Sequence, residues 1–331
     1  MAHQSAAAGA GCDAVPIPIS WNLVGPPDPA DDRLIGTCNS YPWGKKGPDS
    51  LASQLCAKTD KGFSVNDDEY YSEMWFGDYE DFPGRVYNTG EPLEILEKNK
   101  GTLLGGKVIE KLDGQLPYLP KVEFIRHGIN HSIADQLDEA AYILDLTPRL
   151  QDQYGAGDPG LTVALTCMNF IVLEAGDAIY VPADGIHAHL SSDIVECMAC
   201  SNNALNSGFC PPADRKNIDM FCGTLTFKGH SQADVILRSR KSEKSATGKT
   251  VVYKPPMSEF DLLKTALKVG ENDKTSASDG PGVFIVTHGK GKMQADSKMF
   301  ELDEGFIYFI ALGVEIKWET DTAMEIHMAV V

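Results

Sequence analysis

The sequence predicts a mainly β protein made of two β-barrels with a few peripheral helices. Three observations indicate this. From residue 161 to residue 200, apolar residues recur with a period of two, which is typical of strands that bury one face. A second strand-rich block occupies 283–331, and a charged, serine-rich stretch at 238–250 separates the two blocks. The 331 residues, 43% of them hydrophobic, are enough to bury two substantial cores.

Helices are predicted mainly in the N-terminal part of the chain. Residues 1–32 are rich in Ala, Gly and Pro and predict an irregular arm. The apolar residues of 49–58 follow helical spacing, and Asp49 or Ser50 can cap that helix. Two further helical runs lie within 92–112 and are interrupted by glycines.

The first barrel is predicted to span 33–237. The alternation of apolar residues predicts strands in 161–172 and in 178–200, and a short helix is expected within 213–222. Residues 238–250 are expected to form a linker or loop between the barrels.

The second barrel is predicted to span 251–331. We expect a helix at 259–267, followed by strands. The sequence His288-Gly289-Lys290-Gly291 predicts a hairpin turn, because glycine readily adopts the positive φ angles that such turns need. The expected strands lie at 283–287, 305–318 and 323–331.

Composition disfavours several classes of partner. The net charge of −18 disfavours binding to nucleic acid or to anionic membranes. The first residues lack the basic and apolar regions of a secretion signal, and no apolar run approaches the roughly 20 residues of a membrane span. We therefore expect a small-molecule partner, whereas the sequence does not specify an oligomeric state.

The eight cysteines show no spacing typical of a disulfide framework, so we expect reduced thiols and a cytoplasmic location. Cys197 and Cys200 form a Cys-x-x-Cys pair. Residues three apart on a strand point to opposite faces, so this pair does not predict a metal site.

The run from Gly176 to His187, GDAIYVPADGIH, has the form of the second half of a cupin metal-binding signature. Its first two residues supply a tight turn, 179–181 an apolar strand and 182–185 a second turn. This resemblance implies a jelly-roll barrel with His187 pointing into it. In the alternative interpretation, His187 is only a hydrogen-bonded residue of a hairpin.

The stretch 182–211 resembles the type I phosphomannose isomerases, in which a strand ending in Pro-His-Ala-Tyr is followed by Glu-Cys-Met-Ala. Four further segments resemble this family in the same order along the chain. They are 40–45 (SYPWGK), 72–77 (SEMWFG), 116–122 (LPYLPKV) and 253–260 (YKPPMSEF). The resemblance spans about residues 33–331 and implies two cupin barrels, but a fold does not by itself fix an activity.

The chain departs from this family at the zinc ligands that the resemblance implies. Family members hold zinc with Gln-Ala-His, with a Glu farther along and with the histidine of Pro-His-Ala-Tyr, to which His187 corresponds. Arg126, His127 and Gly128 fall on the Gln-Ala-His triplet, and a guanidinium has no lone pair to donate to a metal. The short stretch 136–158 lacks the segment that carries the family's Glu, so this ligand is expected to be deleted.

A second departure concerns two cations that the resemblance implies for substrate binding. Asn206 stands at the position of the family's arginine, and Pro212 stands where a lysine usually follows. Charge-assisted hydrogen bonds contribute about 1.5–3 kcal/mol each, so losing both cations should weaken phosphate binding by several kcal/mol. Mannose 6-phosphate is therefore not the expected substrate, and Asn206 is a candidate site residue.

Replacement ligands are present nearby. His189 lies two residues after His187, and residues i and i+2 of a strand share one face. With Glu196 they form a two-histidine, one-carboxylate set suited to a single divalent metal, zinc foremost. The alternative is that no metal binds and His189 packs inside the barrel. His127 and His131 lie in a sequence typical of a loop and are not expected to bind metal.

These observations favour an isomerase-fold enzyme repurposed to isomerise or cyclise a small organic molecule by proton transfer. His187 and Glu196 are the acid–base candidates, and His189 would assist them. Lys121 and Arg126 could polarise a carbonyl group. Two alternatives remain: a non-catalytic sugar-binding or regulatory protein, and a zinc-dependent mannose-6-phosphate isomerase with rearranged ligands.

Overall fold

The computed structural model describes the chain from residue 34 to residue 331 with gaps. The predicted arm at 1–32 and the predicted helical runs at 92–112 lie outside the described residues. The described ranges are 34–40, 44–75, 85–86, 125–126, 141–166, 168–182, 185–190, 193–198, 205–210, 212, 215, 218–224, 227–228, 230–256, 259–295 and 297–331.

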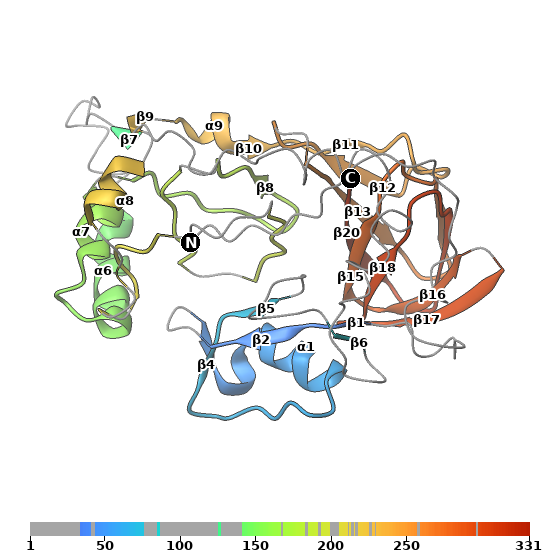
Figure 1. Ribbon diagram of the computed structural model, residues 1–331, viewed down its shortest axis with the longest axis horizontal. Coiled ribbons are helices and arrows are strands. Elements are labelled where there is room, and N and C mark those ends of the chain that lie inside the picture. Colours follow the sequence, from blue (N-terminus) through green and yellow to red (C-terminus); the bar gives the residue numbers. More distant parts are fainter. Residues whose placement is uncertain are drawn as a thin grey trace.

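The C-terminal part is a sandwich of two antiparallel sheets, on the right in Figure 1. One sheet contains the strand order β13-β20-β15-β18 and the other has the order β14-β19-β16-β17. These are the two four-stranded sheets of a jelly roll, because the chain crosses between the sheets at almost every connection. The strands are β12 (Thr250–Tyr253), β13 (Asp261–Leu267), β14 (Asn272–Thr275), β15 (Gly282–His288), β16 (Lys290–Ala295), β17 (Lys298–Asp303), β18 (Ile307–Ile310), β19 (Ile316–Thr320) and β20 (Met324–Val330).

The core of this jelly roll lies between its two sheets. Along β19 and β20, buried residues alternate with more exposed ones, as expected for strands that bury one face. The ring of Phe284 meets that of Trp318 edge-on, with centroids 5.1 Å apart, and lies 5.3 Å from that of Tyr308. The indole N–H of buried Trp318 donates to Thr275 Oγ1 at 2.8 Å, so its one polar group is satisfied.

Strands from outside 251–331 extend the larger sheet at both edges. β11 (Arg240–Lys241) pairs with β12, and β1 (Leu34–Ile35) pairs with β18 through Leu34 and Ile307. β6 (Arg85–Val86) then pairs with β1 and gives the sheet eight strands among the described residues. The N-terminal part of the chain is thereby joined to the C-terminal jelly roll.

The residues 34–75 that the structure describes are called the N-terminal unit below. Helix α1 (Leu51–Thr59) confirms the predicted helix, and Ser50 is its cap, since its hydroxyl accepts from Ser53 N–H. Two short ladders flank the helix. They are β2 (Thr37–Asn39) with β5 (Glu73–Trp75), and β3 (Lys45–Lys46) with β4 (Tyr70–Tyr71), and a 3-10 turn lies at Gly47–Asp49.

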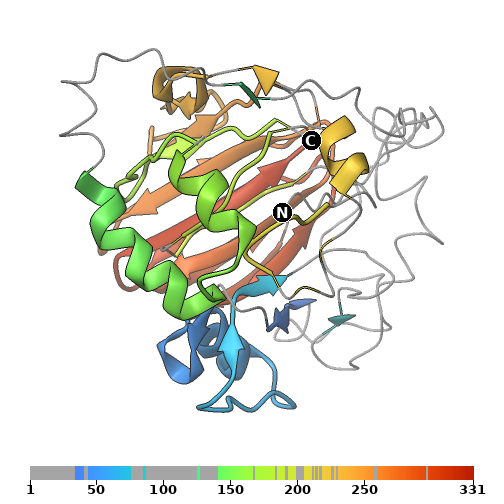
Figure 2. The same cartoon turned by 90° about the vertical axis from the view of Figure 1, so that its left-hand side faces the viewer.

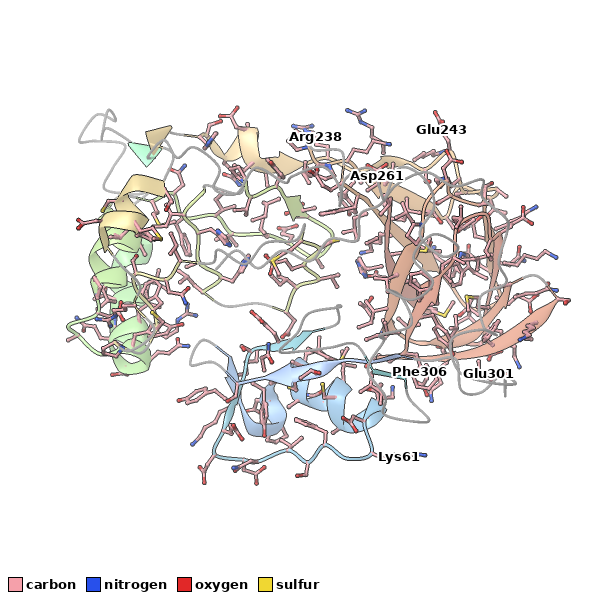
Figure 3. All side chains as sticks on the ribbon, viewed as in Figure 1. Lys61, Arg238, Glu243, Asp261, Glu301 and Phe306 are labelled. Carbon is pink, nitrogen blue, oxygen red and sulfur yellow. The ribbon has the colours of Figure 1, made fainter. Side chains whose placement is uncertain are left out.

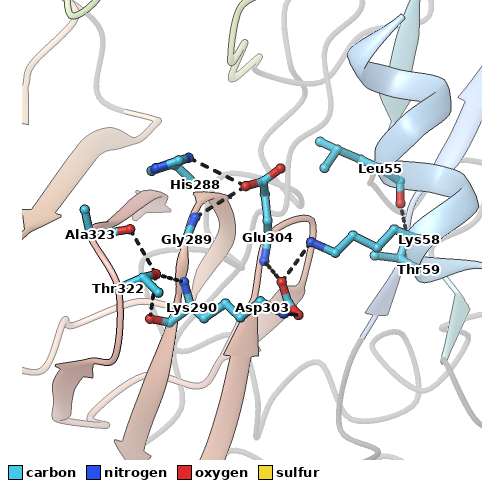
Figure 4. Close-up of polar contacts among 10 residues, drawn as sticks. All are labelled: Leu55, Lys58, Thr59, His288, Gly289, Lys290, Asp303, Glu304, Thr322 and Ala323. Carbon is cyan, nitrogen blue, oxygen red and sulfur yellow. Dashed lines mark hydrogen bonds and ion pairs between the residues drawn. The ribbon is translucent and has the colours of Figure 1, made fainter. Parts of the chain in front are cut away.

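Helix α1 also contacts the jelly roll directly. Lys58 Nζ lies 2.8 Å from Asp303 Oδ1, and Asp303 also pairs with Lys290 (Figure 4). Gly305 follows at a φ of +87°, where a Cβ would lie only 3.1 Å from a Thr59 methyl. Phe306, labelled in Figure 3, lies where the two parts meet. Glycine therefore permits the close approach of this turn to α1.

Helices α6 (Ala141–Tyr154) and α7 (Pro159–Thr166) form a hairpin on the far side of the molecule from the jelly roll (Figures 1 and 2). The chain between them and the jelly roll forms few ladders in the described residues. The remaining elements are β7 (Ile125–Arg126), which pairs with β9 (Phe227–Lys228), β8 (Ala178–Ile179), which pairs with β10 (Ile236–Leu237), α8 (Ile218–Thr224) and α9 (Gln232–Val235). None of the helices in the described part of the chain is long and apolar enough to cross a membrane.

Two predictions of secondary structure were wrong. Residues 161–166 belong to helix α7 and not to a strand, because the short apolar run LTVALT fits either period and Asp158-Pro159 starts a helix. The predicted helix at 259–267 is strand β13, which lies between β12 and β20. Pairing on both sides outweighs the helix propensity of its leucines.

Other predictions were correct in kind but not in extent. Within the predicted strand region 178–200, only β8 forms a ladder among the described residues. The helix expected at 213–222 is α8, which starts later, at Ile218. The hairpin turn at 288–291 is confirmed, with Gly289 at a φ of +82° between β15 and β16.

Replacing Gly289 by alanine should destabilise the protein more than the same change at Gly270. Both glycines have positive φ angles, +82° and +75°, which cost alanine about 1–2 kcal/mol. A Cβ on Gly270 would meet nothing within 4 Å, whereas one on Gly289 would lie within bonding distance of the Ala323 carbonyl oxygen. Urea unfolding should show at least about 1 kcal/mol more destabilisation for Gly289→Ala. Equal destabilisation would contradict this close approach of backbone segments.

Candidate active site

The segment leading to His187 is anchored at both ends of a short strand. Gly176, at a φ of +100°, makes the turn before β8, and its carbonyl accepts from the Tyr253 hydroxyl at 2.7 Å. After β8, Tyr180 N–H donates to the Val235 carbonyl at 2.8 Å. These bonds attach the segment to β12 of the jelly roll and to the chain around α9.

A second turn orients His187. Gly185 N–H donates to the Pro182 carbonyl at 2.9 Å, and His187 Nδ1 lies 3.0 Å from the Gly185 carbonyl oxygen. A carbonyl oxygen can only accept, so Nδ1 carries the hydrogen in this bond. In the neutral ring, the lone pair is therefore on Nε2.

His187, His189 and Glu196 lie together, as the spacing of the two histidines predicts. One nitrogen or oxygen atom from each of the three lies within 4.8 Å of the others. The imidazole centroids are 5.6 Å apart, and His189 Nε2 lies 3.9 Å from Glu196 Oε1. The side chains of His189 and Glu196 are 39% and 35% exposed to solvent, so solvent reaches the cluster.

The charges within this cluster follow from its surroundings. Burial lowers the pKa of His187 to about 4, so the imidazole is neutral near pH 7. Burial raises the pKa of Glu196, but the interaction with nearby His189 outweighs this effect, and the net shift is downward. Glu196 is thus a carboxylate beside a neutral His187. Burial and the Glu196 charge raise the pKa of the neighbouring Cys197 to about 12, so it stays a thiol.

Two contacts fix the chain between His189 and Glu196. Lys45 in β3 pairs with both oxygens of Asp193, at 2.8 and 2.7 Å, three residues before Glu196. Arg149 in α6 donates to the carbonyl of Leu190, next to His189, at 3.1 Å. The N-terminal unit and the helical hairpin therefore contact the site segment directly.

The helical hairpin is joined to the 205–215 segment by a buried carboxylate. Asp158, whose side chain is 1% exposed, accepts from the backbone N–H groups of Gly160 and Phe209 at 2.7 and 2.9 Å. Its other oxygen pairs with Arg215 at 2.7 Å. Behind this pair, apolar side chains of both helices form a small core. It consists of Leu146, Leu150 and Leu161, with Tyr154, Leu190 and Phe209 packed against it.

Two family models match the sequence. "Phosphomannose isomerase type I, catalytic domain" matches residues 32–171, and "Phosphomannose isomerase type I C-terminal" matches 250–298. The chain belongs to the type I phosphomannose isomerase family. The predicted family is thereby confirmed, and the observed jelly roll agrees with the predicted mainly β, cupin-type fold.

Curated relatives match over nearly their whole length. The mannose-6-phosphate isomerase of Cryptococcus neoformans is 23% identical over 436 residues, which cover 92% of this chain and 99% of that protein. The mannose-6-phosphate isomerase of Saccharomyces cerevisiae is 25% identical over 413 residues, or 87% and 95% of the two chains. Both alignments are longer than the 331 residues of this chain, so these relatives carry segments that have no counterpart here.

Solved structures of phosphomannose isomerase share the fold. A mutant of the enzyme from Salmonella typhimurium superimposes with a TM-score of 0.60 at 14% identity, covering 91% of this chain and 99% of that one. Its apo form superimposes with a TM-score of 0.58 at 14% identity.

The other predicted site residues are only partly described. Lys121, His127 and His131 lie outside the described residues. Arg126 belongs to β7, which pairs with β9, but its side chain is outside the described part. Asn206 is half-buried in the segment 205–210, which Asp158 holds at Phe209.

Sequence reasoning missed Glu73, which lies in β5 and contributes to the electrostatics of the cluster. Burial and the nearby Glu196 charge raise the pKa of Glu73, and His189 lowers it. Its only sequence signal is its place in the family-like segment 72–77, which does not reveal an electrostatic interaction with residues more than a hundred positions away.

Replacing Arg215 by alanine should strongly destabilise the protein, because it leaves the buried Asp158 carboxylate without its charged partner. Breaking a buried pair in this way costs about 3–5 kcal/mol. Lys46→Ala is the matched control, because it breaks an ion pair with Asp68 whose side chains are 49% and 92% exposed. Urea unfolding should show a large loss for Arg215→Ala and a small one for the control. Similar small losses would contradict a structural role for the Asp158–Arg215 pair.

Proposed function

We propose that this chain is a phosphomannose isomerase-like enzyme that transfers a proton within a small, uncharged hydroxy-carbonyl compound, at a single divalent metal held by His187, His189 and Glu196. The observation that supports this proposal is the convergence of these three side chains, with donor atoms within 4.8 Å of one another. Two imidazoles and a carboxylate are a donor set typical of zinc and of non-haem iron.

The donor set fits a metal in charge and in orientation. His187 is neutral near pH 7, and its Nδ1 bond to the Gly185 carbonyl leaves the Nε2 lone pair for the ion. A carbonyl partner of this kind commonly fixes the ring of a ligating histidine. Three protein donors leave coordination positions open for a substrate oxygen, and a bound ion would polarise the substrate carbonyl.

Proton transfer is assigned to Glu196. Its lowered pKa keeps the carboxylate ionised near neutral pH, as a base requires. The Glu196 carboxylate would accept the proton from the carbon beside the substrate carbonyl, and its two oxygens would also allow it to help hold a metal. Delivering that proton to the former carbonyl carbon, while the hydroxyl proton passes to the former carbonyl oxygen, completes the isomerisation. If Glu196 transfers no proton, the protein would instead be the non-catalytic sugar-binding or regulatory protein that the sequence left open.

The substrate is proposed to lack a phosphate, because the described cations near the site have internal partners. Lys45 pairs with Asp193, and Arg215 pairs with Asp158. Asn206 and Pro212 stand where the family resemblance implies an arginine and a lysine. Mannose-6-phosphate isomerase activity is the second candidate function. It is favoured by the near full-length similarity to enzymes of that name.

Mannose 6-phosphate should be turned over far below the usual enzyme range of about 1–10³ per second, even with added zinc. The physical reason is the absence of the two expected cations at Asn206 and Pro212. Activity can be followed by NMR in deuterated water, where proton transfer places deuterium beside the carbonyl. Mannose and fructose serve as uncharged probes. Exchange into mannose 6-phosphate at a normal enzymatic rate would establish the second candidate function, whereas no exchange with a wider panel of uncharged sugars would favour the non-catalytic alternative.

His189→Tyr, which introduces the residue of the family motif, should lower zinc occupancy without unfolding the protein. An imidazole donor is lost, and a neutral phenol is a poor replacement. The matched control is His288→Tyr, because His288 is exposed and lies in the jelly roll beside Glu304. Metal content after dialysis against zinc should fall only in the first variant. Equal occupancy in both variants would remove His189 from the ligand set, and a metal-free parent protein would overturn the whole site.

A further inference from the structure

The chain between His189 and Glu196 has little backbone structure of its own. The described parts of this site segment, residues 185–190 and 193–198, belong to no helix or strand. His189 Nε2 and Glu196 Oε1 nevertheless lie 3.9 Å apart. Because segments with few backbone pairs open locally at a low free-energy cost, the separation of these two side chains depends on contacts from other parts of the molecule.

Lys45 provides one such contact. Its Nζ lies 2.8 and 2.7 Å from the two carboxylate oxygens of Asp193, which follows His189 by four residues and precedes Glu196 by three. Charge-assisted hydrogen bonds of this length are about twice as strong as neutral ones. The contact therefore restrains the stretch that determines how far Glu196 lies from His189.

The backbone that carries Lys45 is firmly placed. In the β3–β4 ladder Lys45 lies opposite Tyr71, and Gly44 leaves no room for a Cβ against the Tyr71 carbonyl. The Ser50 hydroxyl donates to the same carbonyl at 2.9 Å, which joins the ladder to the cap of α1. A side chain with a fixed base has less conformational entropy to lose when its tip is held. Lys45 is therefore suited to hold another segment in place.

The next lysine along the strand forms a different kind of pair. Lys46 contacts Asp68 at 3.0 Å within the N-terminal unit, and the Asp68 side chain is 92% exposed. The side chains of Lys45 and Asp193 are 44% and 46% exposed, and they join parts of the chain that are 148 residues apart. Water screens a half-buried pair less than an exposed one, so the Lys45 pair has the greater effect on local structure.

We propose that Lys45 is a positioning residue of the candidate site, which sets the separation of Glu196 from His189 by holding Asp193. This inference rests on the proposed function, in which both of these side chains bind one divalent metal. Lys45 acts through Asp193 and supplies no ligand itself, because an ammonium group has no lone pair to donate. Its loss is expected to loosen the site segment and to weaken zinc binding.

The first measurement reports on the site segment whether or not a metal binds. Cys197 lies next to Glu196 and is half-buried, so its alkylation by iodoacetamide, followed by mass spectrometry, becomes faster when the segment opens. In Lys45→Glu, repulsion from Asp193 replaces attraction, and Cys197 should react about 5-fold faster than in the parent. Buried Cys210, in another segment, is the internal control and should react at the parental rate. An unchanged rate at Cys197 would overturn the proposal.

The second measurement is zinc affinity, determined by competition with a chromophoric chelator at neutral pH. The zinc dissociation constant of Lys45→Glu should be about 5-fold higher than that of the parent, because Glu196 is no longer held near the histidines. Lys46→Glu is the matched control, since it makes the same change of charge on the same strand, and it should bind zinc at least as tightly as the parent. Added negative charge by itself attracts a cation more strongly, so only a positioning role predicts weaker binding in Lys45→Glu.

The reversed pair tests the contact itself. Lys45→Glu combined with Asp193→Lys re-forms the ion pair with opposite polarity and should recover part of both parental values, and no recovery would overturn the role of Asp193 and with it the proposal. If the parent binds zinc and Lys45→Glu binds it no more weakly than Lys46→Glu, the role of Lys45 is overturned while the proposed metal site stands. If the parent binds no zinc, the proposed metal site fails, and the alkylation of Cys197 decides the role of Lys45.

Discussion

The pairing of β1 with β18 is the contact on which the arrangement of the described molecule depends. Through it the chain enters the large sheet of the jelly roll before it builds the rest of the N-terminal unit. The Lys58–Asp303 ion pair and the close approach at Gly305 then hold α1 against β17, in the smaller sheet, and against the turn that follows it. The neighbouring β3–β4 ladder brings Lys45 to Asp193 of the site segment. The site segment is therefore linked to a jelly roll that contributes none of the three donors of the cluster.

Two described cations near the site, Arg215 and Lys45, are used for internal structure. Asp158 accepts two backbone N–H groups and pairs with Arg215, which joins the hairpin α6–α7 to the segment that carries Asn206. Lys45 joins the N-terminal unit to the site segment in the same way. A guanidinium or ammonium group that is held by a carboxylate has less charge to offer a ligand, so these two ion pairs make the site less favourable to an anion.

Local signals in the sequence were sufficient for features that depend on neighbouring residues. Asp49 or Ser50 was predicted as a helix cap, and Ser50 is the cap; the predicted turn at 288–291 contains Gly289. His187 and His189 lie together, although residues 185–190 form no strand. The strand β13 was mistaken for a helix because its identity depends on β12 and β20, and α7 was missed although Asp158-Pro159 marks its start. Glu73 could not be found from spacing, because it and Glu196 are more than a hundred residues apart in the sequence. The ligand set remains a prediction.

The position of β20 has a consequence for synthesis of the chain. This strand comes last in sequence order among the described strands, yet it lies in the middle of the large sheet, between β13 and β15. The two neighbours cannot complete their ladders until residues 324–330 have left the ribosome. Until then, the facing edges of β13 and β15 carry backbone N–H and C=O groups without their partner strand, and unpaired strand edges favour aggregation. Truncation before β20 would remove the centre of the sheet and not its edge.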